Sequence, residues 1–276
     1  MTVEAFAPAK INLTLHVTGQ RADGYHLLDS LVMFADVGDR LWVEAADRTS
    51  LTVSGPMAGG VPTDRRNLVW QAAELLGVTA KITLEKHLPA AAGIGGGSSD
   101  AAAVVRALTT LYNFPVPSAA VLANLGADVP VCMQSGLTRM RGIGEHVDPI
   151  GNTPNWPMIL INPRVEVPTG PVFQALPRKD NPPMPAIPAE WDISWLAAQR
   201  NDLEAPAIAA QPVIGKVLQE LRESDGCLLA RMSGSGATCF AIYAHDDMRD
   251  RALGQLRRDC PKWWTQPTEA CGVKWR

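Results

Sequence analysis

The sequence predicts an α+β fold in two domains, and three observations lead to this prediction. Strand-like runs come first and helical patterns are then mixed among them, which favours α+β over a doubly wound parallel sheet. The length of 276 residues, with 46% hydrophobic side chains, allows two domains or one large one. Gly151, Pro154 and Pro157 cluster near the middle of the chain, so we expect domains at 1–153 and 154–276.

The first predicted strand covers residues 10–17, where apolar and polar side chains alternate. Such alternation is typical of a half-buried strand with one polar face. Asp23-Gly24 then marks a turn, and further strand-like runs follow at 31–36, 41–46 and 51–54. The polar face of the first strand carries Lys10, Asn12, Thr14 and His16, and its apolar face carries Ile11, Leu13, Leu15 and Val17.

Three helices and one more strand are predicted in the rest of the first domain. Asn67 begins a helical pattern that stops at Gly77, and a strand at 81–86 follows. A glycine-rich loop at 93–97 then leads into a second helix, whose apolar residues share one face. A shorter helix is expected near 118–125.

The second domain is predicted to alternate helices and strands after an irregular start. Residues 177–189 hold five prolines and indicate a loop without regular structure. A small-residue loop at 233–236 separates two of the strands. We expect helices at 191–199, 202–223 and 246–259, and strands at 227–231, 237–244 and 267–273.

Composition excludes several classes of protein. The net charge is −3, from 25 basic and 28 acidic side chains, and no basic stripe is present, which argues against nucleic-acid binding. The five cysteines are odd in number and form no C-x-x-C pair, so we expect free thiols rather than disulfides or a zinc site. Without a signal-like N-terminus or a long apolar run, we expect a cytoplasmic protein that does not enter a membrane.

The segment from Pro89 to Asp100 is the most informative stretch. Four of the five residues 93–97 are glycines, so backbone N–H groups can converge on an anion. Ser98 or Ser99 suits the N-cap of the following helix, whose dipole adds a positive end. The segment therefore predicts a cradle for a triphosphate. It lacks the Gly-Lys-Ser/Thr ending of a P-loop and the spacing of a dinucleotide fingerprint. A flexible surface loop is the structural alternative.

Phosphoryl transfer requires positioning and charge neutralisation, and three polar positions are candidates for it. Asp128 lies in an apolar stretch, where an unpaired carboxylate is costly, so it is either a general base or a turn carboxylate. Lys10 is either a partner for Asp128 and the γ-phosphate or a surface lysine. Tyr25-His26 either recognises a flat heterocycle or consists of a packed ring beside a solvated one.

Several segments together resemble the GHMP small-molecule kinases. They are residues 7–13, the loop from Pro89 to Ala102, and Met232 to Gly236. Two further segments, Asp23-Gly24-Tyr25-His26 and residues 125–130, resemble motifs of one group within this family. The kinases of that group phosphorylate cytidine diphosphate methylerythritol. The resemblance implies a ribosomal-protein-S5-like N-terminal domain, a ferredoxin-like C-terminal domain, and ATP with Mg²⁺ as cofactors. It implies this small-molecule substrate as the partner and gives no oligomeric state.

The same resemblance assigns roles to individual positions. Asp128 is implied as the catalytic base and Lys10 as its charged partner, whereas no residue is implied as a metal ligand. Asn67 is implied at the adenine, and Phe173 is expected to stack on one cytosine face. Asn12, Tyr25 and His26 are implied at the cytidine end. The ATP phosphates are expected at Pro89, Ala90, Ala91, Ala92, Gly93, Ile94, Gly95, Gly96, Gly97, Ser98 and Ser99.

Two other functions remain compatible with the residues. One is a related kinase that acts on mevalonate, homoserine or a sugar, against which the Tyr25-His26 element argues. The other is a non-catalytic binding protein on an S5-like fold, against which the presence of both Lys10 and Asp128 argues.

Overall fold

One long strand, β3 (His26–Ala45), organises the N-terminal half of the computed structural model, which describes residues 1–151 and 155–271. Strands line up on both sides of β3, and all of its partners are antiparallel to it. The strands of this sheet besides β3 are β1 (Thr2–Asn12), β2 (His16–Gln20), β4 (Ser50–Ser54), β5 (Ala80–Glu85), β6 (Leu137–Gly142) and β7 (His146–Gly151).

The expected strands at 31–36 and 41–46 are one continuous strand, so the predicted break between them is wrong. Gly38 lies where the break was expected, and a Cβ there would be 2.3 Å from the carbonyl oxygen of Ala7. The absence of a side chain lets β3 pass close to β1 without turning away. The register of β1 and β3 shifts between Pro8 and Lys10, because proline has no N–H to continue the ladder.

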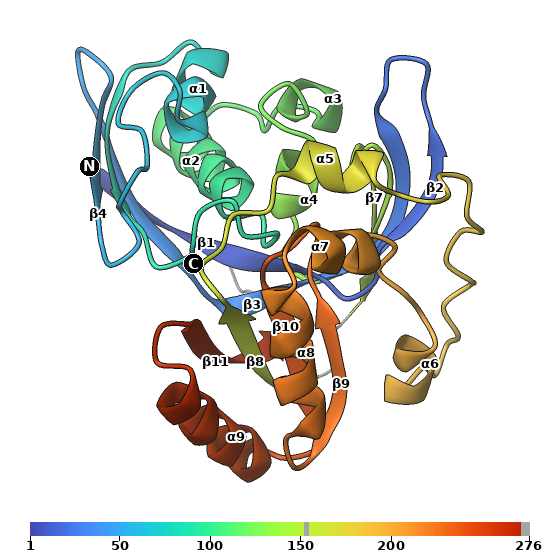
Figure 1. The fold of residues 1–276 in the computed structure, drawn as a ribbon. Coiled ribbons are helices and arrows are strands. Elements are labelled where there is room, and N and C mark those ends of the chain that lie inside the picture. The colour runs from blue at the N-terminus through green and yellow to red at the C-terminus, as the bar shows by residue number, and fades with distance from the viewer. Residues whose placement is uncertain (152–154, 272–276) are drawn as a thin grey trace.

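Helices α1 (Leu68–Leu75) and α2 (Gly96–Tyr112) cover one face of the N-terminal sheet (Figure 1). Their apolar faces pack into a core with the inward side chains of β1, β3 and β5. The helix expected at 118–125 is a single turn, α3 (Ala119–Leu122), and a second turn, α4 (Val129–Cys132), was not expected. Both turns are too short to show a helical period.

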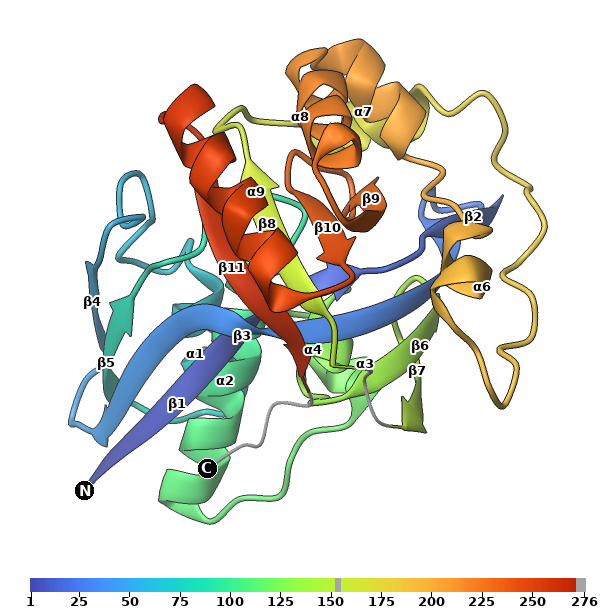
Figure 2. The same cartoon turned by 90° about the horizontal axis from the view of Figure 1, so that it is seen from below.

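The C-terminal half contains a four-stranded antiparallel sheet in the order β11-β8-β10-β9. Helices α8 and α9 pack against this sheet, as expected for a ferredoxin-like arrangement (Figure 2). The strands are β8 (Pro157–Asn162), β9 (Cys227–Met232), β10 (Cys239–Tyr243) and β11 (Trp264–Cys271). The helices are α5 (Thr169–Gln174), α6 (Ile193–Ala197), α7 (Glu204–Ala210), α8 (Val213–Glu223) and α9 (Asp246–Asp259).

Most of the predicted C-terminal elements are present with shifted bounds. The single helix expected at 202–223 is divided into α7 and α8, because Pro212 interrupts the helical hydrogen bonding. Residues 177–189 form neither helix nor strand, as predicted. β8 and α5 were not expected. The last residues of the strand predicted to reach 273 lie outside the described residues, and so does the boundary predicted between 153 and 154.

The two halves are joined by a shared hydrophobic core and not only by the chain that connects them. β11 pairs with β8 along its length and with β3 at Phe34 and Ala35, so it connects the two sheets. A cluster of fully buried side chains includes Ile11 and Met33 from one half and Leu160 from the other. The expected strand at 10–17 is therefore not half-buried. β1 ends at Asn12, and the polar side chains of this segment are buried by the C-terminal half.

Within the described residues, no helix is long and apolar enough to cross a lipid bilayer. Four cysteines, Cys132, Cys227, Cys239 and Cys260, are free thiols, as predicted.

Candidate active site

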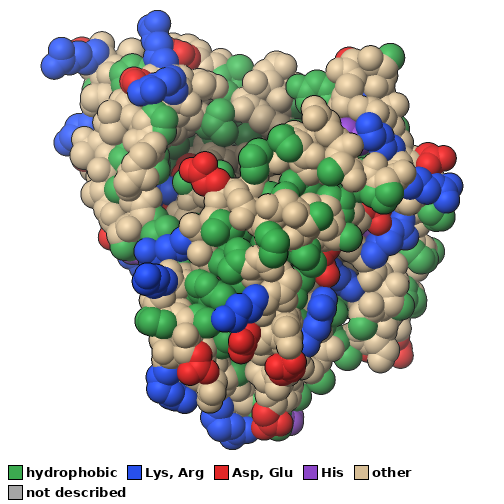
Figure 3. All heavy atoms as spheres, viewed as in Figure 1, with side chains coloured by type: hydrophobic (Ala, Val, Ile, Leu, Met, Phe, Trp, Pro, Cys, Tyr) green, Lys and Arg blue, Asp and Glu red, His purple; other side chains and the backbone are tan. Residues whose placement is uncertain are grey.

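A cavity of about 820 Å³ opens where the two halves meet, and both halves line it. The surface is hollowed there, between α2 and α5 (Figure 3). The N-terminal half contributes the end of β1, the turn between β2 and β3, and the glycine-rich loop. The C-terminal half contributes α5 and the loop that follows β9. Most of the predicted site residues therefore come together around one space.

Lys10 and Asp128 form an ion pair at the wall of this cavity. The distance from Lys10 Nζ to Asp128 Oδ2 is 2.9 Å. The lysine side chain is 4% exposed and the aspartate side chain is 35% exposed, so the carboxylate is the part of the pair that faces solvent. The register shift near Pro8 leaves the N–H of Lys10 free of β3, and it donates instead to the carbonyl of Ile94 at 2.9 Å. The strand that carries the lysine is thereby joined to the glycine-rich loop.

Asn12 orients the lysine from the next inward position of β1. Its Oδ1 accepts a hydrogen bond from Lys10 Nζ at 3.0 Å, and its Nδ2 donates to Ser30 Oγ at 2.8 Å. The backbone N–H of Asn12 donates to Ser233 Oγ at 3.0 Å. Asn12 lines the cavity, but it is 1% exposed and both ends of its amide contact protein. A contact with the cytidine end of a substrate remains a prediction.

The glycine-rich loop turns into α2 earlier than expected. The helix begins at Gly96, and its N-cap is Gly95 in a left-handed conformation with φ of 62°, so the predicted serine cap is wrong. A Cβ on Gly95 would lie 3.0 Å from Lys10 Cε, so a side chain there would displace the lysine as well as strain the left-handed backbone. The N–H groups of Gly96, Gly97 and Ser98 precede the first intrahelical hydrogen bond and are free to bind an anion.

The residues expected at the phosphates divide into two groups. Ile94 and Ser99 are fully buried, and the Oγ of Ser99 makes no hydrogen bond to a described residue. Pro89 and Ala90 also lie outside the cavity lining. The residues of this segment that line the cavity are Ala91, Ala92, Gly93, Gly95, Gly96, Gly97 and Ser98.

Asn67, expected at the adenine, caps helix α1. Its Oδ1 accepts from the N–H of Val69 at 2.9 Å, and its Nδ2 donates to the carbonyl of Pro62 at 2.8 Å. The neighbouring Leu68 lines the cavity, whereas Asn67 does not. A contact between Asn67 and adenine is therefore still a prediction.

The expected cytidine-binding residues meet at the far end of the cavity. The rings of His26 and Phe173 stack on each other, with centroids 4.7 Å apart and planes inclined by 24°. This distance leaves no room for a base between them, so Phe173 can stack on a cytosine only from its other side. Tyr25 is 58% exposed at the tip of the turn. Burial and nearby Lys179 lower the pKa of His26, which keeps its ring neutral at pH 7.

Comparison with known proteins agrees with this geometry. The family model of the GHMP kinase N-terminal domain matches residues 67–139, and the model of the C-terminal domain matches residues 191–262. A protein from Cereibacter sphaeroides (strain ATCC 17025 / ATH 2.4.3) named 4-diphosphocytidyl-2-C-methyl-D-erythritol kinase is 54% identical, over 98% of this chain and 99% of its own. The chain belongs to the 4-diphosphocytidyl-2-C-methyl-D-erythritol kinase family of GHMP kinases. It is therefore an ATP-dependent phosphotransferase.

Other relatives of this kinase family support the same placement. The protein of that name from Dinoroseobacter shibae is 55% identical over 96% of this chain and 94% of its own. A crystal structure of a 4-(cytidine 5'-diphospho)-2C-methyl-D-erythritol kinase has a TM-score of 0.81 at 36% identity, covering 98% of this chain and 100% of that one. A homoserine kinase from Cytophaga hutchinsonii, at 18% identity and a TM-score of 0.71 over 100% and 97% of the two chains, shares the fold.

Sequence reasoning missed a buried charge cluster beneath the glycine-rich loop of this kinase. The Lys86 ammonium contacts both Asp39 and Asp100, and its distance to Asp100 Oδ2 is 2.6 Å. Asp39 also accepts from the N–H groups of His87 and Leu88 at 2.6 and 2.9 Å. Burial raises the pKa of Asp100 to about 8, although Lys86 opposes this shift. The cluster holds the segment before the loop against the start of α2.

Arg106 makes a second set of contacts near the site that the sequence did not reveal. Its guanidinium donates to the carbonyl of Cys132 at 2.9 Å and to that of Phe6 at 3.0 Å. It therefore ties the strand that carries Lys10 to the helical turn that follows Asp128. Burial lowers the pKa of Arg106 to about 10, so the side chain remains charged at neutral pH. A lone arginine within a helix gives no signal of such a contact in the sequence.

Proposed function

We propose that the chain transfers the γ-phosphoryl group of ATP to the 2-hydroxyl of 4-diphosphocytidyl-2-C-methyl-D-erythritol. The products would be the 2-phosphate and ADP, as a step in non-mevalonate isoprenoid precursor biosynthesis. The observation that carries the proposal is the Lys10–Asp128 pair, held 2.9 Å apart at a cavity that the glycine-rich loop also lines. The names of relatives more than 50% identical support the substrate.

In the proposed reaction, Asp128 accepts the proton of the 2-hydroxyl as its oxygen bonds to the γ-phosphorus. The bond from the γ-phosphorus to the bridging oxygen breaks, and ADP leaves. Lys10 balances the negative charge that spreads over the transferring group. The hydroxyl is on a tertiary carbon and is poorly acidic, so holding it in line with the phosphorus supplies much of the acceleration. Asn12 contributes by fixing the lysine ammonium beside Asp128.

The phosphates of ATP are proposed to lie on the free N–H groups at the start of α2. Gly96, Gly97 and Ser98 line the cavity, and the 17-residue helix directs its positive end at this point. The adenine is proposed to lie near Leu68 and Asn67, which begin α1 at the same side of the cavity.

Mg²⁺ is proposed to accompany the ATP phosphates. Within residues 1–151 and 155–271, no group of three acidic, histidine or cysteine side chains could hold a metal ion. This fits Mg²⁺, which usually keeps several waters and takes few protein ligands beside phosphate oxygens. Ser98 lines the cavity at the start of α2, and its hydroxyl suits that role. The ion would neutralise charge on the phosphates.

The proposed partners are small molecules alone, in the cytoplasm and without nucleic acid or membrane. The net charge of −3 supports this, because nucleic-acid binding requires an excess of basic side chains along one surface. On the face seen in Figure 3, Lys and Arg side chains are interspersed with Asp and Glu.

Substrate choice is tested by measuring ADP formation with separate alcohols. We expect turnover with 4-diphosphocytidyl-2-C-methyl-D-erythritol and at most about one hundredth of that kcat/KM with mevalonate, homoserine or galactose, because a site that hydrogen-bonds a group rejects substrates lacking it. Equal or better turnover with one of the three would contradict the proposed substrate. A lack of turnover with all four, in a protein that binds ATP, would contradict the proposed activity.

A further inference from the structure

The hairpin that carries Tyr25 and His26 extends away from the rest of the sheet (Figure 1). β2 pairs only with the first residues of β3, from His16 opposite Asp29 to Gln20 opposite His26. Among the strands of the described chain, β2 has no partner on its outer edge. A two-stranded hairpin is marginally stable by itself in water, so the position of His26 depends on contacts from outside the sheet.

Residues 179–184, which we call the strap, run along that outer edge. Lys179 Nζ donates to Gln20 Oε1 at 3.2 Å, and the N–H of Asn181 donates to the carbonyl of Val17 at 3.1 Å. The strap thus passes β2 in the opposite direction, like an added strand. Pro182 and Pro183 have no N–H, so a regular ladder cannot form and the strap needs side-chain contacts at its end.

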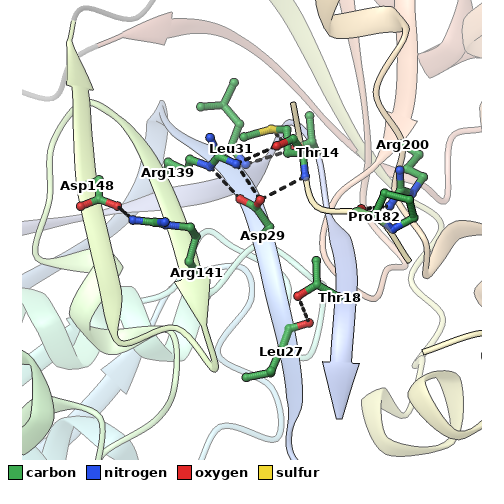
Figure 4. A network of polar contacts seen from close by, with 11 residues as sticks. Thr14, Thr18, Leu27, Asp29, Leu31, Arg139, Arg141, Asp148, Pro182 and Arg200 are labelled. Carbon is green, nitrogen blue, oxygen red and sulfur yellow. Dashed lines mark hydrogen bonds and ion pairs between the residues drawn. The ribbon is translucent and has the colours of Figure 1, made fainter. Parts of the chain in front are cut away.

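Those contacts form a clamp on Met184. It is made by Asp29 and Arg139, whose side chains face each other in Figure 4. The N–H of Met184 donates to Asp29 Oδ2 at 3.0 Å, and its carbonyl accepts from Arg139 Nη2 at 2.8 Å. Arg139 also donates two hydrogen bonds to the carboxylate of Asp29, from Nε to Oδ1 at 2.8 Å and from Nη2 to Oδ2 at 2.7 Å. The side chain of Asp29 is 4% exposed and that of Arg139 is 20% exposed, so solvent screens the pair weakly.

The clamp lies directly behind the wall of the cavity. Leu28 and Met140, the sequence neighbours of Asp29 and Arg139, line the cavity, and side chains alternate between the two faces of a strand. Asp29 and Arg139 therefore act on the opposite face of the same two strands. The strap also begins only a few residues after Phe173, whose ring stacks on His26. The strap is thereby connected through a short segment to α5, which carries Phe173.

We propose that Asp29 and Arg139, through the strap, are positioning residues that set the affinity of the site for the cytidine end of the substrate. They touch neither the cavity nor the Lys10–Asp128 pair, so their effect is expected on substrate binding rather than on chemistry. The substrate named in this inference rests on the proposed function. The positioning of the hairpin by the strap does not depend on the proposed function, and it can be measured separately.

The test compares Arg139→Gln with Arg141→Gln in the full chain. Arg141 is two residues along β6 and pairs with Asp148 at 2.6 Å, but both side chains are about half exposed, so it is the matched control (Figure 4). For Arg139→Gln we expect KM for the cytidine substrate to rise about tenfold, with kcat and KM for ATP within about twofold, because a buried charge-assisted contact is lost. Arg141→Gln should match the wild type.

Hydrogen–deuterium exchange provides the second readout, over residues 16–26. We expect faster exchange there in Arg139→Gln and no change in Arg141→Gln. Because Asp29 is left without its cation in the single variant, the double variant Asp29→Asn/Arg139→Gln keeps two neutral hydrogen-bonding side chains in case the first fails to fold. Arg139→Lys should recover part of the lost affinity.

An unchanged KM for the cytidine substrate in a folded Arg139 variant would overturn the inference, and so would an equal rise in both KM values. If the wild type fails to phosphorylate this substrate, the proposed function is wrong. Hydrogen–deuterium exchange alone then tests whether the clamp positions the hairpin. Wild-type exchange over residues 16–26 in the Arg139 variants would then overturn the clamp.

Discussion

At the residue scale, His16 is an exception to the rule that buried polar atoms find partners. Its side chain is 1% exposed, and neither ring nitrogen makes a hydrogen bond of normal geometry to a described residue. Arg200, Asp202 and Asp29 are the charged groups that surround it. Burial, followed by the charge of Arg200, lowers its pKa. Asp202, a hydrogen bond to the Pro182 backbone and Asp29 only partly oppose this shift. The ring is therefore neutral in the folded protein at pH 7.

This predicts a specific loss of stability in acid. The unfolded chain binds a proton at His16 with a pKa of about 6.5, whereas the folded chain binds it only at lower pH. The contribution is complete above pH 6.5 and is lost as the pH falls below it, at up to about 1.4 kcal/mol per pH unit. His16→Leu should raise the free energy of unfolding by about 1 kcal/mol at pH 7, because an apolar side chain replaces a buried imidazole whose hydrogen bonding is incomplete.

Urea unfolding of wild type and His16→Leu at pH 7.5 and 5.5 checks this prediction. The gain from the substitution should be larger at pH 5.5. A gain that is the same at both pH values would show that folding does not lower the pKa of His16. A gain that is larger at pH 7.5 would show that folding raises this pKa.

The residues of the site were predictable to different degrees. Asp128 could be proposed because a carboxylate in an apolar stretch requires a reason. Lys10, on the polar face of a predicted strand, gained its role from the family resemblance, and the structure joins the two. The cluster of Lys86, Asp39 and Asp100 could not, because each is an ordinary charge in sequence and the partners are far apart along the chain. The contacts of Asn67 and Asn12 with protein were equally invisible in the sequence, since amides bond to whatever the fold brings near.

At the element scale, the site depends on two small-residue loops that contact each other. Ser233 Oγ donates to the carbonyl of Gly93 at 3.0 Å, and the N–H of Thr238 donates to the carbonyl of Ala92 at 3.1 Å. Gly93 has φ of 72°, and a Cβ there would lie 2.4 Å from the carbonyl oxygen of Ser233. The loop after β9 thus fixes the glycine-rich loop from the C-terminal half.

Gly93→Ala should separate the loops, whereas Gly77→Ala is a matched control. Gly77 has a similar φ of 66°, with nothing within 4 Å of the added Cβ. Both variants carry the cost of a left-handed non-glycine residue, about 1–2 kcal/mol. We expect Gly93→Ala to lose at least about 1 kcal/mol more, because the backbone contact is also broken, and to weaken ATP binding about tenfold.

Thermal unfolding and ATP titration of the two variants measure these effects. Equal losses of stability in the two variants would mean that the contact between the loops contributes nothing to stability. If Gly93→Ala bound ATP with wild-type affinity, the contact between the loops would not be needed for nucleotide binding.

Elements with a clear period or a stop signal were predicted well. α1 follows an asparagine cap and ends before glycine, and α9 begins with acidic residues and ends with basic ones. β7 was not predicted because five of its six residues are exposed and the sixth, a valine, is half-buried. No alternation of buried and exposed side chains therefore marks this strand. α5 has six residues, too few to show a helical period.

At the scale of the whole molecule, the cavity exists because two sheets share a core and leave a gap above it. The antiparallel pairing of β11 with both β8 and β3 joins the halves. The α+β class followed from the order of strands and helices, but this pairing could not, because strand partners are chosen by long-range packing. The buried polar face of the segment 10–17 has a similar origin, since the C-terminal half contributes contacts such as that of Ser233 with Asn12.

The central claim, that Asp128 takes the proton while the glycine-rich loop holds ATP, is tested most directly by Asp128→Asn. Turnover of 4-diphosphocytidyl-2-C-methyl-D-erythritol and calorimetric ATP binding are measured on the same preparation. We predict that kcat falls by about 10²–10⁴, because the general base is lost, while the Kd for ATP stays within about threefold. A variant that retains near-normal kcat would contradict the account.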